Sequence, residues 1–398
     1  MKNVLLIIPY GSVGGIERLA VTFYENLKKW GYNVKVIKII GLHNDIVNFG
    51  KDEYRLSEKD LSDLSPIQRI LFYIKIPFLI RNIIQQNKID ISLAFGDMAN
   101  SFSAISGTKE KKVASLHAVK SIEFKNIAGI NKFFKWSLAN SYKRFDKVVA
   151  ISEAIKQDLI ENCNYRFQNL ITIYNPHDFD LIKERSQESL SENEQLIFEK
   201  KVILFLGRLS IQKAPWQLIK AFNAIKQQFP DHQLVLIGDG DTNVEYYLKQ
   251  LLGKQGDERI FFLGRKNNPY KYLARAECLA LSSFYEGTPN VIVEAMALNI
   301  PILTSNCTEG INEMMIDKIN QLQQDNILTD AGIITNTINQ QTDIGIPQDF
   351  SVTPEDHKFA EALIQILDAD VNDKVRNADK TKLLSKFDLE KVIKAYLN

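Results

Sequence analysis

Two glutamates form a candidate pair of functional carboxylates: Glu286 and Glu294 lie eight positions apart in the segment EGTPNVIVEAMALNIP. A glycosidase uses such a pair as acid and nucleophile. On one helix, however, the two groups would be about 12 Å apart at 1.5 Å per residue, whereas a glycosidase needs roughly 5–9.5 Å. The spacing therefore favours two contacts to the hydroxyl groups of one extended ligand.

The residues between these glutamates predict the start of a short, buried helix. Thr288 is the candidate N-cap, and Pro289 suits the first helical position because its missing N–H would have no partner there. Asn299 tolerates a left-handed conformation and predicts the end of the helix. The first turn, with Asn290 and Val291, would present free N–H groups to a phosphate.

Two cations follow the first strand that we predict in the second half of the chain. The strand KVILFL leads into Gly207, Arg208 and then Lys213. Ligands of open α/β sheets bind at the carboxyl ends of the strands. An arginine fork and a lysine ammonium there could stabilise the charge on a leaving diphosphate. The alternative is that both are ordinary surface charges.

These segments resemble the signature of the retaining glycosyltransferases of family 4. The matching parts are Glu-x7-Glu followed by Ala-Met-Ala, and Gly-Arg-x4-Lys. The resemblance implies that Glu286 lies at the donor sugar near the anomeric carbon and that Glu294 holds the ribose hydroxyls. It also implies that the loop between them binds the diphosphate and sugar through Gly287, Thr288, Pro289, Asn290 and Val291.

This sequence departs from the family pattern at a few positions. Asn299 and Asn306 stand where the family usually has Gly and often Asp, and Ala214-Pro215 replaces a usual Gly. Asn is the next best left-handed residue after Gly, so the first change is compatible with the same helix end. Arg265, after the strand IFFLG, resembles the place where family backbone atoms meet the base.

The first half of the chain opens with a strand, a glycine-rich loop and a helix, VLLIIPY-GSVGG-IERLAVTFYENLKKW. The loop does not match the dinucleotide fingerprint G-x-G-x-x-G, so a dehydrogenase is not supported. Gly14, Gly15 and Glu17 resemble the family's Gly-Gly-x-Glu, which borders the cleft between domains; a plain tight turn is the alternative. His117 ends the strand KKVASLHA, and the resemblance places it near donor sugar and acceptor, although a lone histidine is usually structural.

Composition and charge are those of an ordinary globular protein with an uneven charge distribution. The chain has 398 residues, 45% of them hydrophobic and 24% charged. Its three cysteines lack metal-ligand spacing and predict reduced thiols, and we expect no metal and no other cofactor. Residues 1–178 hold 25 Lys and Arg against 17 Asp and Glu, and the rest 24 against 31. This asymmetry predicts an anionic ligand or surface facing the first half, with no indication of nucleic acid.

The segment 125–147 carries much of this positive charge at helical spacing. One interpretation is a helix that attaches the protein to an anionic membrane in a salt-reversible way; the other is a helix that faces the core and has a solvated basic side. Its apolar members are Ile127, Ile130, Phe134, Leu138 and Phe145, and its basic members are Lys125, Lys132, Lys135, Lys143, Arg144 and Lys147.

The predicted fold class is α/β, with two Rossmann-like domains facing across a cleft in the GT-B arrangement. We expect a first domain at 1–178, a linker at 179–198, a second domain at 199–375, and a C-terminal helix at 376–398 that packs back on the first domain. Residues 316–350 predict an irregular loop or insertion.

The resemblance implies retaining transfer from a nucleotide diphosphate sugar, such as a UDP-sugar, to a hydroxyl of a bacterial glycan acceptor, for example a lipopolysaccharide, O-antigen or capsule intermediate that can be lipid-linked. We expect a cytoplasmic enzyme, with peripheral attachment to the inner face of the membrane as an open alternative. A nucleotide-sugar epimerase of the same fold and a non-catalytic nucleotide-sugar-binding module remain alternative functions.

Overall fold

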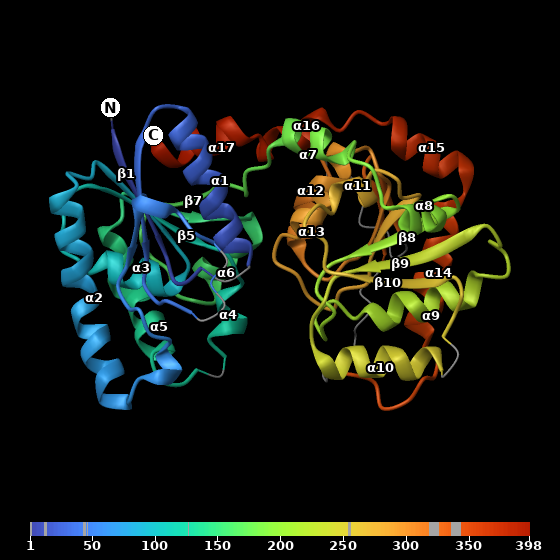
Figure 1. Ribbon diagram of the computed structural model, residues 1–398, viewed down its shortest axis with the longest axis horizontal. Helices are drawn as coiled ribbons and strands as arrows, with labels where there is room; N and C mark the ends of the chain where they lie inside the picture. The colour runs from blue at the N-terminus through green and yellow to red at the C-terminus, as the bar shows by residue number, and fades with distance from the viewer. Residues whose placement is uncertain are drawn as a thin grey trace. The chain divides into compact units, whose positions relative to one another are not determined.

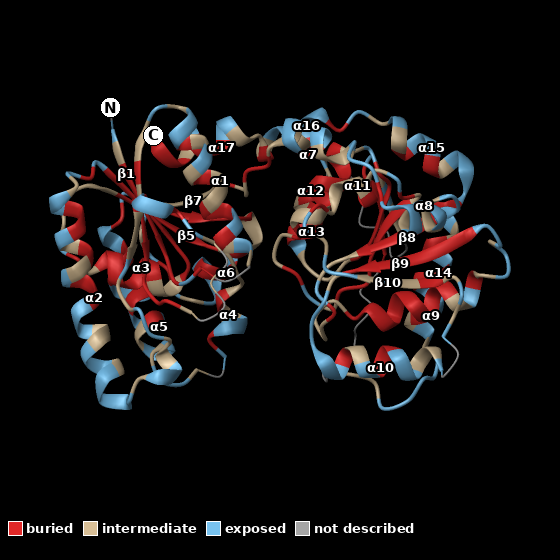
Figure 2. Cartoon of the chain, in the orientation of Figure 1, coloured by how far each residue is buried: buried red, intermediate tan, exposed pale blue. Residues whose placement is uncertain are grey.

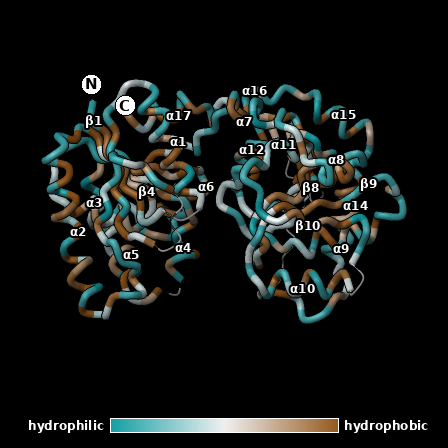
Figure 3. The backbone as a smooth tube through the Cα atoms, viewed as in Figure 1, coloured by the Kyte–Doolittle hydropathy of each residue, from teal (hydrophilic) through white to brown (hydrophobic). Residues whose placement is uncertain are grey.

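The computed structural model describes residues 2–11, 14–42, 45, 47–125, 127–253, 256–317, 326–335 and 344–398. They form two compact units, Met1–Pro176 with Leu389–Asn398 and His177–Asp388 (Figure 1). Each unit is built on a seven-stranded sheet. Apolar and β-branched runs supply the strands, which are the most hydrophobic and most deeply buried parts of each unit (Figures 2 and 3).

The first sheet is parallel in all of its paired strands and has the order β3-β2-β1-β4-β5-β6-β7. The strands alternate with helices along the chain, as expected for a doubly wound sheet. The strands are β1 (Asn3–Ile8), β2 (Asn33–Lys38), β3 (Glu53–Arg55), β4 (Ile91–Phe95), β5 (Lys111–Leu116), β6 (Lys147–Ala150) and β7 (Leu170–Thr172). The helices are α1 (Gly15–Lys29), α2 (Pro66–Gln86), α3 (Asp97–Ala104), α4 (Lys120–Glu123), α5 (Asn131–Asn140) and α6 (Glu153–Glu161).

The second sheet has the order β10-β9-β8-β11-β12-β14-β13 and is parallel except for the pair β13–β14. Its strands are β8 (Lys201–Leu206), β9 (His232–Ile237), β10 (Ile260–Gly264), β11 (Cys278–Leu281), β12 (Ile302–Ser305), β13 (Ile327–Thr329) and β14 (Gly332–Thr335). Its helices are α7 (Phe179–Ser186), α8 (Glu192–Phe198), α9 (Pro215–Ile225), α10 (Thr242–Leu252), α11 (Tyr270–Leu273), α12 (Asn290–Ala297), α13 (Glu309–Met315), α14 (Pro354–Leu367), α15 (Ala369–Asn377) and α16 (Thr381–Leu384).

The last helix, α17 (Leu389–Leu397), belongs to the first unit, whereas residues 376–388, which we had grouped with it, belong to the second. Val392, Ile393 and Tyr396 are buried in the core formed by β1 and α1. The Tyr396 hydroxyl lies 2.9 Å from Ser115 Oγ on β5. The chain therefore returns to its first sheet only in its last ten residues.

Residues 179–198 are not a linker, as the charge pattern had suggested, but form α7 and α8 within the second unit. Asp178 caps α7 by accepting a hydrogen bond from Leu181 N at 3.0 Å. Glu194 of α8 binds Lys266 at 2.8 Å and the Tyr272 hydroxyl at 2.7 Å. These contacts are distant in sequence, so the local charge pattern did not predict them.

Two other segments differ from their predicted structure. Within 316–350, residues 327–329 and 332–335 are strands of the second sheet rather than an irregular loop, while 318–325 and 336–343 lie outside the described residues. The segment 125–147 is not one helix, because α5 ends at Asn140 and β6 starts at Lys147. Phe134 and Leu138 of α5 are buried, so the apolar side of this segment faces the core. In the described ranges, no helix combines the length and hydrophobicity needed to cross a bilayer.

Candidate active site

The loop after β8 holds Gly207 and Arg208 and is anchored to the loop after β9. Leu209 N donates to Asp239 O at 3.0 Å, and Asp241 N donates to Leu209 O at 2.8 Å. A Cβ atom at Gly240 would lie 2.2 Å from Leu209 O, so only glycine permits this close approach. The Gly-Asp-Gly turn therefore fixes the position of the two cationic residues that follow β8.

Lys213 and Glu286 come together at the carboxyl ends of β8 and β11. The Lys213 ammonium forms an ion pair with Glu286 Oε1, and Ser283 Oγ donates to the same oxygen at 2.6 Å. Gln212 Nε2 lies 3.4 Å from the other carboxylate oxygen. The Glu286 side chain is 6% exposed and that of Lys213 is 15% exposed. Two residues that we had selected from separate segments thus form one polar cluster.

Arg208 lies on the same loop, and its side chain is exposed. Among the described residues its guanidinium has no ion-pair partner. Gly207, its neighbour, is so close to Lys213 that a Cβ atom there would lie 3.6 Å from Lys213 Cε. Arg208 is therefore an exposed cation on the same loop as Lys213 and is available to an anionic ligand.

The helix α12 follows Glu286 and is short and buried, as predicted, but it starts one residue later than we expected. Its N-cap is Pro289, whereas Thr288 does not cap the helix. The Thr288 hydroxyl is buried and has no hydrogen-bond partner in the described part of the chain. Glu294 lies in the middle of α12 and is buried. Asn299 has φ = 56°, the predicted left-handed conformation.

The loop residue Gly287 packs against the start of α13. A Cβ atom at Gly310 would lie 2.4 Å from Gly287 O, so glycine is required for this contact. Asn306, at the end of β12, accepts a hydrogen bond from Asn312 Nδ2 at 3.3 Å. Burial, and to a lesser extent the Glu286 carboxylate, raise the pKa of Cys307 to about 12, so this thiol is protonated and unreactive at neutral pH.

In the first unit, His117 follows β5 at the carboxyl edge of the sheet, where we predicted it. Its Nε2 is buried and has no hydrogen-bond partner among the described residues. Burial, with a smaller contribution from the Lys120 charge, lowers the pKa of His117 to about 3. Lys120 is itself bound to Asp97 at 2.8 Å and to Glu123 at 2.5 Å. The imidazole is therefore neutral at physiological pH.

Gly14 and Gly15 lie where β1 leads into α1; Gly14 is the extended N-cap residue and Gly15 the first helical residue. A Cβ atom at Gly14 would lie 2.4 Å from Glu17 Oε2, so the Glu17 side chain occupies the space beside this glycine. Burial, and secondarily the Asp45 charge, raise the pKa of Glu17. The predicted glycine loop is thus closely associated with a buried carboxyl group.

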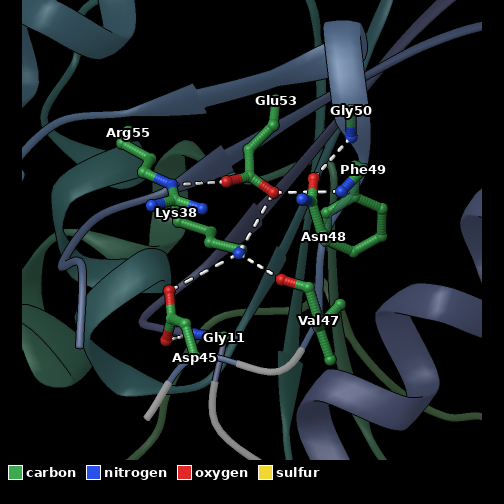
Figure 4. Close-up of polar contacts among 9 residues, drawn as sticks. All are labelled: Gly11, Lys38, Asp45, Val47, Asn48, Phe49, Gly50, Glu53 and Arg55. Atoms are coloured by element: carbon green, nitrogen blue, oxygen red, sulfur yellow. Dashed lines mark hydrogen bonds and ion pairs between the residues drawn. The ribbon is translucent and has the colours of Figure 1, made fainter. Parts of the chain in front are cut away.

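A buried lysine that the sequence analysis missed lies at the same edge of the first sheet (Figure 4). Lys38 Nζ, at the end of β2, contacts Glu53 Oε2 at 3.0 Å, Asp45 Oδ2 at 3.5 Å and the Val47 carbonyl. Asp45 also accepts a hydrogen bond from Gly11 N at 2.9 Å. The signal for this cluster was a lysine within the otherwise apolar end of the strand NVKVIK.

The remaining predicted residue, Arg265, is exposed in the loop after β10, and the described contacts do not connect it to the Lys213–Glu286 cluster. Ser283 and Gln212, which bind Glu286, were not predicted. Ser283 could have been found because it follows β11, at a strand end close to Glu286. Gln212 had no comparable signal, because its role depends on the packing of two loops.

Two family models match the chain. The model described as Glycosyl transferases group 1 matches residues 186–340, and the model described as Glycosyltransferase Family 4 matches residues 13–181. Together they cover most of both units. The chain belongs to the group 1 glycosyltransferases. This group 1 glycosyltransferase is therefore an enzyme. Its likeness to solved structures confirms the predicted fold class, GT-B.

Individual relatives agree with this assignment. An uncharacterised glycosyltransferase of Methanocaldococcus jannaschii is 27% identical over 267 residues, which are 64% of each chain. A Campylobacter jejuni enzyme is 27% identical over 324 residues, 79% of this chain and 83% of that protein. It is named N-acetylgalactosamine-N,N'-diacetylbacillosaminyl-diphospho-undecaprenol 4-alpha-N-acetylgalactosaminyltransferase. The crystal structure of Anabaena HepE with UDP and glucose is 18% identical, covers 100% of this chain and 98% of its own, and has a TM-score of 0.71.

Proposed function

We propose that this glycosyltransferase moves a hexosyl or N-acetylhexosaminyl group from a UDP-sugar, with retention of configuration, to a hydroxyl of a lipid-linked or capsular glycan intermediate. The observation that carries the proposal is the Lys213–Glu286 pair, with Arg208 on the same loop as Lys213. It combines cations for a diphosphate with a carboxylate for sugar hydroxyls. The known donors and acceptors of relatives support the same chemistry, since HepE binds UDP and glucose and the Campylobacter enzyme is named for a diphospho-undecaprenol acceptor.

In this proposal Arg208 and Lys213 stabilise the negative charge that accumulates on the leaving diphosphate. The N-terminal end of α12, where the helix dipole is positive, and the Thr288 hydroxyl, which has no hydrogen-bond partner among the described residues, bind phosphate or sugar oxygens. Glu294 accepts hydrogen bonds from the ribose hydroxyls. Because two side-chain cations supply the positive charge, we propose that transfer needs no metal.

Glu286 has the role closest to the transferred sugar. Lys213 and Ser283 hold its carboxylate in one orientation, so that it can accept hydrogen bonds from sugar hydroxyls next to the anomeric carbon. His117 in the first unit is neutral and can donate or accept one hydrogen bond. We assign it to binding the transferred sugar or the acceptor hydroxyl. Gly14, Gly15 and Arg265 are assigned to the donor through the family resemblance.

Membership of the group 1 glycosyltransferases favours transfer over an epimerase or a non-catalytic binding module. We also propose that the enzyme works at the inner face of the cytoplasmic membrane. This proposal is supported by the excess positive charge of the first half and by the diphospho-undecaprenol acceptor in the Campylobacter enzyme's name.

A panel of nucleotide sugars tests the function. Release of free nucleotide is measured for each donor, with and without undecaprenyl-diphosphate-linked glycans and short water-soluble glycans. We expect one UDP-sugar to release UDP in an acceptor-dependent way and the product to have the same anomeric configuration as the donor, by NMR. An inverted product would contradict retention, and conversion of the free nucleotide sugar to an epimer would contradict transfer.

A further inference from the structure

The helix α2 has a row of apolar side chains that face solvent. Counted from the first of these five residues, the others follow after three, four, seven and eleven positions, which places all five on one side of the helix. Each is between 51% and 71% exposed: Ile67, Ile70, Leu71, Ile74 and Phe78. We call this row the α2 stripe. Figure 2 shows that the first half of α2 is largely exposed, whereas its second half is partly buried.

The opposite side of α2 already supplies the core. Ile76, Ile80, Ile83 and Ile84 are buried in a cluster with residues of β1 and β2. The α2 stripe is therefore not needed to attach the helix to its own domain. Rows of exposed apolar residues of this extent are uncommon on monomeric proteins and mark interaction surfaces or membrane contacts.

Helices α2 and α5 both pack against α3. An aromatic series links the two helices through α3: Tyr73 stacks on Phe102 of α3 with ring centroids 6.1 Å apart, Phe102 packs on Phe133 at 5.6 Å, and Phe133 stacks on Trp136 at 6.0 Å. Trp136 itself is 54% exposed. Phe102 is buried, so the series connects α2 and α5 through the core. Trp136, whose indole prefers membrane interfaces, is the exposed aromatic residue at its end.

The charged side chains on these two helices are of one sign, although Asp60 and Asp63 lie in the segment just before α2. Neither α2 nor α5 contains an acidic residue. Exposed lysines lie on both helices: Lys75 on α2, and Lys132 and Lys135 on α5. An amphipathic helix with apolar residues on one side and lysines beside them binds in the plane of an anionic membrane, and each lysine near the surface contributes about 1 kcal/mol.

We propose that the α2 stripe, together with Trp136 and these lysines, inserts into the headgroup region of an anionic bilayer. The inference rests on the proposed function in one respect, the lipid-linked acceptor, which requires the enzyme to work at a membrane. It differs from the membrane interpretation of residues 125–147, because Phe134 and Leu138 of α5 face the core and leave Trp136 and the lysines exposed. The insertion is provided by α2 instead.

Sedimentation with vesicles of phosphatidylcholine and phosphatidylglycerol tests the insertion. The variant I67Q/I70Q/I74Q keeps good helix formers at exposed positions, so it should fold. We expect it to bind these vesicles at least tenfold more weakly than the wild type. The matched control L196Q/Y246Q removes two exposed apolar side chains, 64% and 67% exposed, from the second unit and should bind like the wild type.

The contribution of the lysines to vesicle binding and the depth of Trp136 in the bilayer are tested separately. K132E/K135E should weaken binding to anionic vesicles severalfold, while part of the wild-type binding should persist in 1 M salt because the α2 stripe is apolar. Brominated lipids should quench the fluorescence of Trp136, measured as the difference between the wild type and W136F. Unchanged vesicle binding by I67Q/I70Q/I74Q, or an absence of quenching, would overturn the proposal.

Two further outcomes are distinguishable. If the wild type forms dimers that I67Q/I70Q/I74Q does not form, and vesicle binding is unchanged, the α2 stripe is covered by a second copy and the membrane proposal is wrong. The triple variant should transfer sugar to a water-soluble acceptor at the wild-type rate. If the wild type binds vesicles through α2 but no donor and acceptor pair supports transfer, the proposed function fails while the docking surface stands.

Discussion

Lys213 and Glu286 form an ion pair although 73 positions separate them in the sequence. In the proposed function the Lys213 ammonium would serve two anions, because it orients the nearly buried Glu286 carboxylate and would also contact the diphosphate of a donor. Arg208 has no such partner among the described residues and remains exposed. The two cations are expected to have different effects when they are removed.

Arg208→Ala should lower turnover by about 10²–10³-fold, as when a donor to a developing anion is removed. The thermal unfolding midpoint should stay unchanged, because the side chain is exposed. Initial rates at saturating donor and differential scanning calorimetry measure the two effects. Lys201→Ala, a change of a surface lysine on β8, is the matched control.

Lys213→Ala should reduce turnover to a similar extent and should also destabilise the second unit. The loss leaves the Glu286 carboxylate without its cation, at a cost of about 1–3 kcal/mol. Near-wild-type activity of both Arg208→Ala and Lys213→Ala would show that the diphosphate is bound elsewhere.

Substitutions of Glu286 and Glu294 should have different effects on UDP affinity and on the rate of sugar transfer. Glu294→Ala should weaken the affinity for free UDP, because this carboxylate is assigned to the ribose, whereas Glu286→Ala should mainly lower the rate of sugar transfer. Isothermal titration calorimetry with UDP and rates at saturating donor separate the effects. Equal losses of UDP affinity in the two variants would contradict the division of roles.

His117 should make the protein less stable in mild acid. Its folded pKa of about 3 lies below the ordinary value of 6.5, so the unfolded chain binds a proton first as the pH falls. The stabilisation of the neutral folded form is complete above pH 6.5 and is lost below it by up to about 1.4 kcal/mol per pH unit. Denaturant unfolding at pH 7 and pH 5 should therefore show a smaller loss for His117→Gln than for the wild type. His357→Gln, at an exposed position on α14, should behave like the wild type.

Ala214 adopts a left-handed conformation, with φ = 41°, at the N-cap of α9. A Cβ atom is unfavourable there, so Ala214→Gly should stabilise the second unit by about 0.5–1 kcal/mol. Ala221→Gly, in the interior of the same helix, should have the opposite effect. The unfolding midpoints in urea compare the two, and a destabilised Ala214→Gly would contradict the strain.

The sequence alone predicted the alternation of strands and helices and the loops that bear Gly207, Arg208, Glu286 and His117. These features depend on local patterns: an apolar run becomes a strand, and the ligand-binding residues follow its carboxyl end. The left-handed Asn299 was predictable for the same reason, since Asn tolerates this conformation and Pro301 follows.

Only the tertiary structure decided which distant residues meet. The helices within 179–198, the strands within 327–335 and the return of α17 to the first sheet all depend on partners far away in the sequence. The same holds for Ser283 and Lys213 at Glu286. Periodicity identifies the apolar side of a helix but not what covers it, so it could not show that α5 turns its apolar side inward while α2 leaves one exposed.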